Sequence, residues 1–187
     1  RVAGWLMAST NARINAFAMA SLSVRPGEHV LEIGFGPGTV LGRLLQVVGE
    51  GTVAGVDPSE LMVAQAGARH RDLVGAGRLE LHTAGVSALP FEAATFDAVL
   101  SVNTLYFWPD PPRDAAEVRR VMKPGGRIVL AFRVGRDRDG VLGLRTTSGR
   151  RSADEVLGWL RDGGFSDPRV ETRKLGFMNA ACVVATA

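Results

Sequence analysis

The sequence contains very few of the side chains that form disulfides, bind zinc or act as nucleophiles. Cys182 is the only cysteine among 187 residues, which excludes an internal disulfide and a cysteine-based zinc site. It lies in the apolar run A-C-V-V-A, where we expect a small buried side chain. We expect no metal site. A chain without disulfides fits the cytoplasm, and we expect that location.

Long hydrophobic runs are missing as well. No apolar segment approaches the ~20 residues of a membrane span, so we expect none. The first residues lack the charged and then apolar pattern of a signal peptide. The formal net charge is only +3, although the chain has 22 basic residues. This balance does not favour a nucleic-acid partner, and we expect none.

Hydrophobic residues make up 46% of the chain, which is typical of a globular protein. We find no internal repeat and no linker, so residues 1–187 are predicted to form one domain. Residues 1–27 are expected to be an N-terminal helical segment and residues 28–187 the core. The sequence does not indicate an oligomeric state.

Residues 30–39 read V-L-E-I-G-F-G-P-G-T, a short apolar run that stops at Gly34, Gly36 and Gly38. A segment with leucines at helical spacing begins directly afterwards. A strand, a glycine loop and a helix together can hold a nucleotide-like ligand, because backbone N–H groups at the helix start are free to donate. The same residues could instead form a tight turn that binds nothing.

The loop differs from the dinucleotide fingerprint G-x-G-x-x-G/A, because Thr39 occupies the last position. Glu32 also precedes the first glycine by two residues. A carboxylate would repel a pyrophosphate and attract a cation. The loop therefore favours a cationic nucleoside over NAD.

The next apolar run, 52–56, ends at Asp57, which lies 23 residues after Gly34. In a βαβ unit an acid at this place can accept hydrogen bonds from both ribose hydroxyls. Asp57 could instead cap the following helix, although Ser59 could do so as well. We favour the ribose role.

Strands and helices are predicted to alternate along the rest of the chain, which indicates an α/β fold with a parallel sheet covered on both sides. A capping-box pattern, S-A-D-E, begins a late helix. The residues 123–126, K-P-G-G, are predicted to form a turn. The predicted helices are 10–22, 41–48, 60–70, 113–122 and 152–162, and the further strands are 78–83, 96–102, 127–132, 169–175 and 180–186.

Two segments have open interpretations. Thr10 is a plausible cap for the first helix, and the apolar cluster Gly4–Met7 before it either docks on the core or folds over a ligand as a lid. Docking is favoured. Residues 133–151 hold six arginines and several glycines. They form either a solvated loop or a positive rim that would favour anionic substrates.

The ordered motifs V-L-E-I-G-F-G-P-G-T, G-V-D-P-S, L-P-F, F-D-A-V-L-S-V-N and V-M-K-P-G-G-R-I-V-L-A-F resemble the class I S-adenosylmethionine-dependent methyltransferases. The chain is most similar to the small ubiquinone-biosynthesis type, the type 11 group, over about residues 28–133. The resemblance implies a doubly wound, Rossmann-like, mostly parallel seven-stranded sheet. Its strand order would be 3-2-1-4-5-7-6, with the last strand antiparallel.

The resemblance also implies where S-adenosylmethionine and its product S-adenosylhomocysteine would bind. The glycine loop would pass under the methionine part, with Glu32 near the amino group. Asp57 would hold the ribose, and Pro58 or Met62 would lie against the adenine. Asn103, Thr104 and Leu105 would line the place where donor and acceptor meet. The implied cofactor-binding residues are Glu32, Gly34, Phe35, Gly36, Gly38, Thr39, Asp57, Pro58, Met62, Gly85, Val86, Asn103, Thr104 and Leu105.

One position departs from the family pattern. Many relatives have Gly-Asp-Ala before L-P-F, and that Asp contacts the adenine amino group. Here Gly85 occupies the position. A hydrogen bond to the adenine edge would have to come from backbone near Val86 or Ser87. Losing one neutral contact would cost about 0.5–1.5 kcal/mol.

The activity implied is methyl transfer to a small-molecule acceptor by in-line displacement. A metabolite, a quinone precursor or a lipid head group would fit. The stretch 103–108, N-T-L-Y-F-W, is the best acceptor-side candidate, and its Tyr106 could orient a nucleophile. Phe107 and Trp108 could shield the sulfonium or only pack the next helix. None of the three histidines falls in the acceptor-side segments. A catalytically idle cofactor-binding protein and an NAD-dependent oxidoreductase remain as alternatives.

Overall fold

The computed structural model describes residues 2–134, 152–176 and 178–187, with backbone only for residues 2–10 and Met178. The elements in chain order are α1 (Val2–Leu22), β1 (His29–Ile33), α2 (Leu41–Val48), β2 (Thr52–Asp57), α3 (Glu60–Arg69), α4 (Arg71–Gly75), β3 (Leu79–Thr83), β4 (Phe96–Val102), the 3₁₀ turn η1 (Leu105–Phe107), α5 (Pro111–Val121), β5 (Met122–Val134), α6 (Ala153–Asp162), β6 (Ser166–Leu175) and β7 (Met178–Thr186). None of the described helices is both long enough and apolar enough to cross a bilayer.

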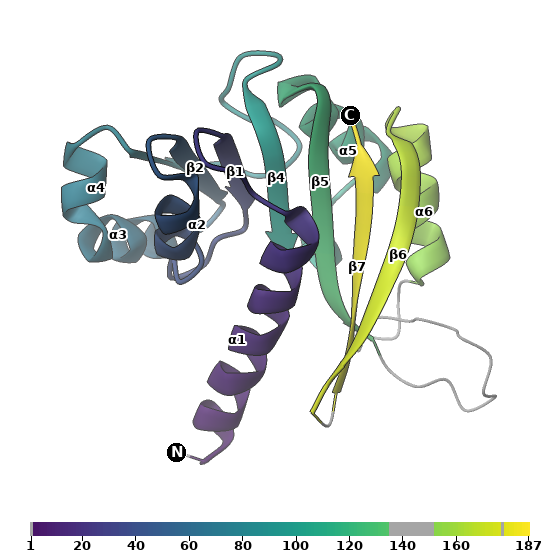
Figure 1. Ribbon diagram of the computed structural model, residues 1–187, viewed down its shortest axis with the longest axis horizontal. Helices are drawn as coiled ribbons and strands as arrows, with labels where there is room; N and C mark the ends of the chain where they lie inside the picture. The colour runs from purple at the N-terminus through teal and green to yellow at the C-terminus, as the bar shows by residue number, and fades with distance from the viewer. Residues whose placement is uncertain (1, 135–151, 177) are drawn as a thin grey trace.

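The strands form one seven-stranded sheet in the order β3-β2-β1-β4-β5-β7-β6, which confirms the predicted fold. β7 runs antiparallel to β5 and β6, and the other neighbouring strands pair in parallel. Helices α1, α2 and α3 cover one face, and α5 and α6 cover the other (Figure 1). Because both faces are covered, central strands such as β1 and β4 are almost entirely apolar.

The first helix is longer than the sequence indicated. It begins at Val2, so the predicted cap at Thr10 is wrong and that residue lies inside α1. Ile14, Phe17 and Leu22 are buried against the sheet. The N-terminal half of α1 extends past the ends of β1 and β4 (Figure 1). The side chains of the Gly4–Met7 cluster lie outside the described residues. The predicted loop 133–151 is wrong at its first two residues, which belong to β5, and its remaining residues lie outside the described part of the chain.

The predicted turn at residues 123–126 is part of β5. Phe96 pairs with Met122 and Ala98 pairs with Arg127, so the four intervening residues bulge opposite one residue of β4. Gly125 takes a φ of +77°, which glycine adopts without strain. Ala187 holds the bulge in the sheet: its carbonyl accepts from Gly125 N at 3.0 Å. The local turn signal was correct, but the strand continues on both sides of it.

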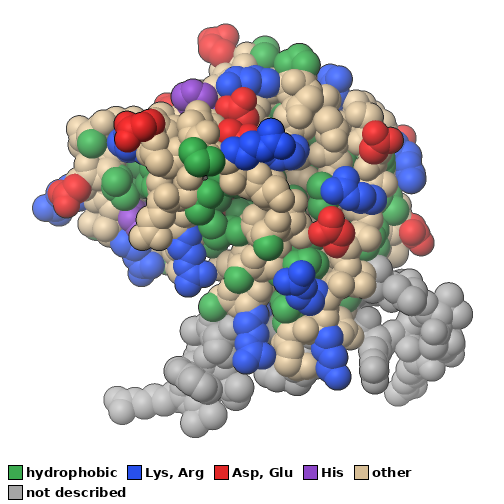
Figure 2. Space-filling model, in the orientation of Figure 1, with side chains coloured by type: hydrophobic (Ala, Val, Ile, Leu, Met, Phe, Trp, Pro, Cys, Tyr) green, Lys and Arg blue, Asp and Glu red, His purple; other side chains and the backbone are tan. Residues whose placement is uncertain are grey.

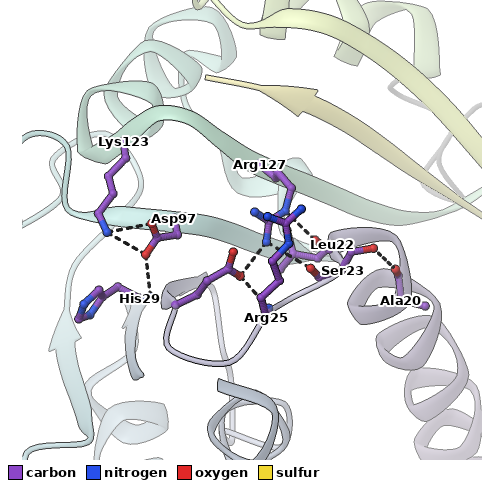
Figure 3. A network of polar contacts seen from close by, with 9 residues as sticks. Ala20, Leu22, Ser23, Arg25, His29, Asp97, Lys123 and Arg127 are labelled. Carbon is purple, nitrogen blue, oxygen red and sulfur yellow. Dashed lines mark hydrogen bonds and ion pairs between the residues drawn. The ribbon is translucent and has the colours of Figure 1, made fainter. Parts of the chain in front are cut away.

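A polar network ties α1 to the start of the sheet (Figure 3). Arg127 Nη2 donates to Glu28 Oε2 at 2.7 Å, and its Nε donates to Leu22 O at 3.0 Å. Lys123 forms an ion pair with Asp97, which also accepts from His29 N. This edge holds the N-terminal ends of β1 and β4. The opposite edge, where the parallel strands end, is therefore free for a binding site.

Candidate functional site

The loop between β1 and α2 requires glycine at two positions. Gly34 has a φ of +72°, and a Cβ there would collide with the Thr104 methyl group. Gly38 has a φ of +73°, and a Cβ there would lie 2.9 Å from Ala66 Cβ. The loop is thus pressed against the segment after β4 and against α3. Only a backbone without side chains fits this space.

Asp57 joins the glycine loop to the end of β2. Its Oδ2 accepts a hydrogen bond from Gly36 N at 2.8 Å, and its Oδ1 accepts one from Ser59 N at 3.0 Å. Ser59, not Asp57, is the N-cap of α3, since its side chain accepts from Met62 N. The helix-cap alternative for Asp57 is therefore wrong. The Asp57 carboxylate is only 7% exposed and lines the pocket described below.

Glu32 lies on the central strand β1 beside Gly55 of β2, in register with it. Glu32 is only 4% exposed, and its Oε2 has no hydrogen-bond partner among the described residues. The pKa of Glu32 is raised to about 8, first by burial and then by the negative charge of Asp57. A cation near this carboxylate would relieve both effects.

A pocket of about 490 Å³ lies where β1, β2 and β4 end. It is lined by Ile33, Gly34, Asp57, Pro58, Ala84, Gly85, Val86, Ser87, Val102, Asn103, Thr104, Phe107, Trp108 and Pro109. Among the described residues, the other predicted cofactor contacts do not line it: these are Glu32, Phe35, Gly36, Gly38, Thr39, Met62 and Leu105. Phe35 and Leu105 are instead buried in the two cores.

One wall of the pocket, the loop of residues 84–91, is fixed by side chains of α5. Ser87 Oγ donates to Asp114 Oδ1 at 2.7 Å. One turn further, Glu117 Oε1 accepts from Leu89 N at 2.8 Å, and Arg120 donates to the carbonyl of Leu89 at 3.1 Å. Sequence reasoning missed Asp114 because no local motif signals a contact with a residue 27 positions away. Gly85 has open space around the position of a Cβ.

The segment after β4 brings polar groups to the pocket. Asn103 has a φ of +58°, its N–H donates to Ala131 O at 2.8 Å, and its Oδ1 has no partner among the described residues. The hydroxyl of Thr104 bonds to that of Ser101. Trp108 also lines the pocket, and its buried indole Nε1 has no partner in the described part of the chain. Buried polar atoms without partners are costly, so these atoms fit a site that a polar ligand completes.

The aromatic residues of this segment have separate positions. Phe107 is 79% exposed at the pocket, so it does not pack the next helix. Trp108 is buried in the core and also lines the pocket. Tyr106, the predicted catalytic candidate, packs partly buried with its ring edge-on to Phe107. It is not part of the described lining.

Asp57 is the only ionisable side chain among the described residues that line the pocket. His29 bonds to Thr52, and His82 bonds to Glu80. His70 Nε2 lies 2.8 Å from Gly38 O, so His70 supports the glycine loop from the side. The arrangement is suited to binding and orienting a ligand, since its lining offers no second group for proton transfer.

Comparisons with known proteins agree with this geometry. The methyltransferase domain family matches residues 31–130. The uncharacterized methyltransferase YdaC of Bacillus subtilis is 26% identical over 184 residues, which cover 98% of this chain and 97% of YdaC. The phosphatidylethanolamine N-methyltransferase of Cereibacter sphaeroides is 30% identical over 149 residues, 78% of this chain and 71% of that protein.

A solved structure gives the same answer. The chain is similar to a SAM-dependent methyltransferase from Aquifex aeolicus, with a TM-score of 0.75 and 25% identity, over 92% of this chain and 88% of that one. Sequence, fold and pocket position lead to one assignment. The chain belongs to the type 11 methyltransferase domain family and is a class I S-adenosylmethionine-dependent methyltransferase.

Proposed function

We propose that this pocket binds S-adenosylmethionine and that the enzyme transfers its methyl group to a small-molecule acceptor. The observation that carries the proposal is the position of Asp57. Its carboxylate lines the pocket at the end of β2 and is held by N–H groups of Gly36 and Ser59. A fixed carboxylate at this position suits the two ribose hydroxyls.

With the ribose at Asp57, the proposed positions of the methionine and adenine parts of the cofactor follow. The glycine loop, from Gly34 to Gly38 with Phe35 between, passes under the methionine part, and Thr39 follows it shortly before α2 begins. Glu32 lies behind the loop as the counter-charge for the amino group, since its Oε2 lacks a partner. Pro58, Gly85 and Val86 line the adenine end. Met62 packs behind the site, and Leu105 supports the lining from the core.

The bound cofactor supplies a methyl group already activated on a sulfonium. The chain's own residues then have to orient the acceptor and exclude water, and such positioning can supply up to about 7–11 kcal/mol. Asn103 and Thr104 lie at the acceptor end, and the exposed ring of Phe107 is available to cover it. The described lining offers no second ionisable group. The acceptor that fits best therefore reaches the pocket with a free lone pair, as a neutral amine does.

The relatives support a small or lipid-linked acceptor. A lipid head group is favoured by the similarity to the phosphatidylethanolamine N-methyltransferase, which covers 78% of this chain. A metabolite or a quinone precursor is compatible with the same pocket. An NAD-dependent oxidoreductase is disfavoured by Thr39, which occupies the last position of the dinucleotide fingerprint where glycine or alanine is expected.

The test is calorimetric titration with S-adenosylmethionine and S-adenosylhomocysteine. We expect micromolar binding that Asp57→Ala weakens at least tenfold. Asp154→Ala, which removes an exposed carboxylate at the start of α6, is the matched control and leaves binding unchanged. Binding of NADH instead would refute the proposal. Cofactor binding without turnover of any acceptor would support the catalytically idle alternative.

A further inference from the structure

Three arginines lie near the middle of α1, on the sheet face that also carries Glu32. Two of them are on strands, and the third is on α1 itself. Arg133 on β5 donates from Nη2 to Asn11 Oδ1 of α1. The guanidinium of Arg173 on β6 lies 4.6 Å from the ring centroid of Phe17. Arg13, on α1 itself, approaches Gly176 at the end of β6. Figure 2 shows basic side chains over this lower part of the face, where α1 and β6 lie.

Sheet register places Arg133 and Arg173 on one level. Both pair with Ala180 of the intervening strand β7, so their side chains lie on the same face about 10 Å apart. Ala180 belongs to the core that α1 covers. The two guanidinium groups therefore flank α1 on the same side of the sheet.

Strand register relates Arg133 to the candidate site, although Arg133 is not among the residues that line the pocket. Val102 lines the pocket and pairs with Ala131, which is two residues before Arg133 on β5. Residues two apart on a strand face the same way and are about 7 Å apart. Arg133 thus continues the face of Val102 beyond the pocket edge, toward the extended half of α1 (Figure 1).

The charge of Arg133 has no anionic partner among the described residues. Its guanidinium donates to the neutral amide of Asn11, and its buried Nε has no partner within the part of the chain that the structure describes. No described carboxylate lies within ion-pair distance of Arg13 or Arg173 either, and the nearby Glu171 pairs with Arg169. Arg133 is half-buried, and a half-buried guanidinium without an ionic partner among the described residues would be stabilised by an anion beside it.

From this arrangement we infer that the methyl acceptor carries a phosphate group and that Arg133 binds it. This inference rests on the proposed methyl transfer in the adjacent pocket. A guanidinium presents parallel N–H donors that match phosphate oxygens, and its fixed charge suits a permanent anion. Arg13 and Arg173 add positive potential that attracts the acceptor toward α1. Asn11 is a positioning residue that holds the guanidinium.

The experiment follows the Arg133 Nε–H signal by ¹⁵N NMR in protein saturated with S-adenosylhomocysteine; Arg133→Lys identifies that signal. The probes are O-phosphoethanolamine as a free phosphate ester, phosphatidylcholine vesicles containing phosphatidylethanolamine as a lipid source, and ethanolamine as the probe without phosphate. We expect a phosphate probe to shift the signal and ethanolamine to leave it in place. The probe that binds more tightly identifies the source of the phosphate.

Substitutions separate recognition by Arg133 from general charge attraction. Arg133→Gln is expected to weaken phosphate binding at least tenfold while S-adenosylhomocysteine binds as before. Arg71→Gln removes one exposed positive charge on α4, at the far end of the sheet, and is expected to change phosphate binding less than twofold. Equal losses in both variants, or no binding of either phosphate probe by cofactor-loaded protein, would overturn the inference. Failure to bind S-adenosylhomocysteine at all would instead refute the proposed function.

Discussion

Asp114, fully buried in α5, accepts a hydrogen bond of 2.7 Å from Ser87, which lines the candidate cofactor pocket. Its second oxygen accepts from Asp110 N at 3.0 Å. Both oxygens of the carboxylate therefore accept a hydrogen bond, and Asp114 links the start of α5 to the loop of residues 84–91. No residue of α5 is part of the described lining, although Trp108 and Pro109, just before the helix, are. The position of the pocket wall therefore depends on a helix that does not itself line the pocket.

We predict that Ser87→Ala and Asp114→Ala are not additive. Removing the hydroxyl leaves a buried carboxylate oxygen without its donor, which costs about 1–3 kcal/mol of unfolding free energy. Asp114→Ala costs at least as much, because it also orphans Asp110 N. The double variant should then be no less stable than Asp114→Ala alone, since both changes remove the same contact. Urea denaturation of the four proteins measures this, and purely additive losses would contradict it.

The raised pKa of Glu32 predicts a pH-dependent stability. The value of about 8 in the fold lies above the ordinary 4.5, so between these pH values the folded state holds a proton that the unfolded chain has lost. The stabilisation is complete below about pH 4.5, and it falls as the pH rises toward 8. A pKa that is higher by one in the folded state than in the unfolded chain corresponds to about 1.4 kcal/mol.

Glu32→Gln tests this assignment because glutamine carries no titratable proton. Relative to wild type, the variant should gain unfolding free energy between pH 5 and pH 8, by a few kcal/mol if the pKa in the fold is as high as about 8. Parallel stability curves for the two proteins would show that Glu32 does not titrate in this range. The cofactor's amino group should lower the same pKa, so S-adenosylhomocysteine binding at pH 7 should release a proton. Calorimetry in buffers of different ionisation enthalpy measures that release.

The contact between Gly34 and Thr104 predicts a specific rescue. Gly34→Ala should lower the unfolding free energy by about 2–4 kcal/mol, from about 1–3 for the collision and about 1 for the left-handed backbone. The methyl group of Thr104 is the atom nearest to the added Cβ. Thr104→Ser removes that methyl group. In the double variant the unfolding free energy lost to the collision should therefore be regained, and only the loss from backbone strain should remain. Thermal unfolding of the single and double variants measures these losses. If Gly34→Ala lowers the unfolding free energy equally with threonine and with serine at position 104, the predicted contact is wrong.

Much of this protein could be read from short stretches of sequence. The glycine loop, the strand ending at Asp57 and the capping box at Ser152 each depend on neighbours within a few residues, and the structure contains all three elements. The order of such units gives the parallel sheet, because strands alternating with helices have few ways to pack. The strand order itself came from the family resemblance, and the sheet has that order.

Local patterns failed where distant residues decide. The glycines at 125 and 126 signal a turn correctly, but Ala187 pairs with them and keeps the segment in β5 as a bulge. α1 continues through Thr10 to Val2, although a threonine there is also a good cap. In both places the residues favour the local structure, a turn or a helix cap, by only about 1 kcal/mol. One tertiary contact can contribute more than that.

The residues alone determined the fold class, the glycine loop and the acid that ends β2, because these depend on spacing along the chain. Only the tertiary structure brought Ser87 to Asp114 and Arg133 to Asn11, across 27 and 122 residues respectively. It also left the oxygen of Glu32 and the Nε of Arg133 buried without partners. Such contacts depend on how the helices pack on the sheet, and burial is set by the whole assembly of layers rather than by any one segment.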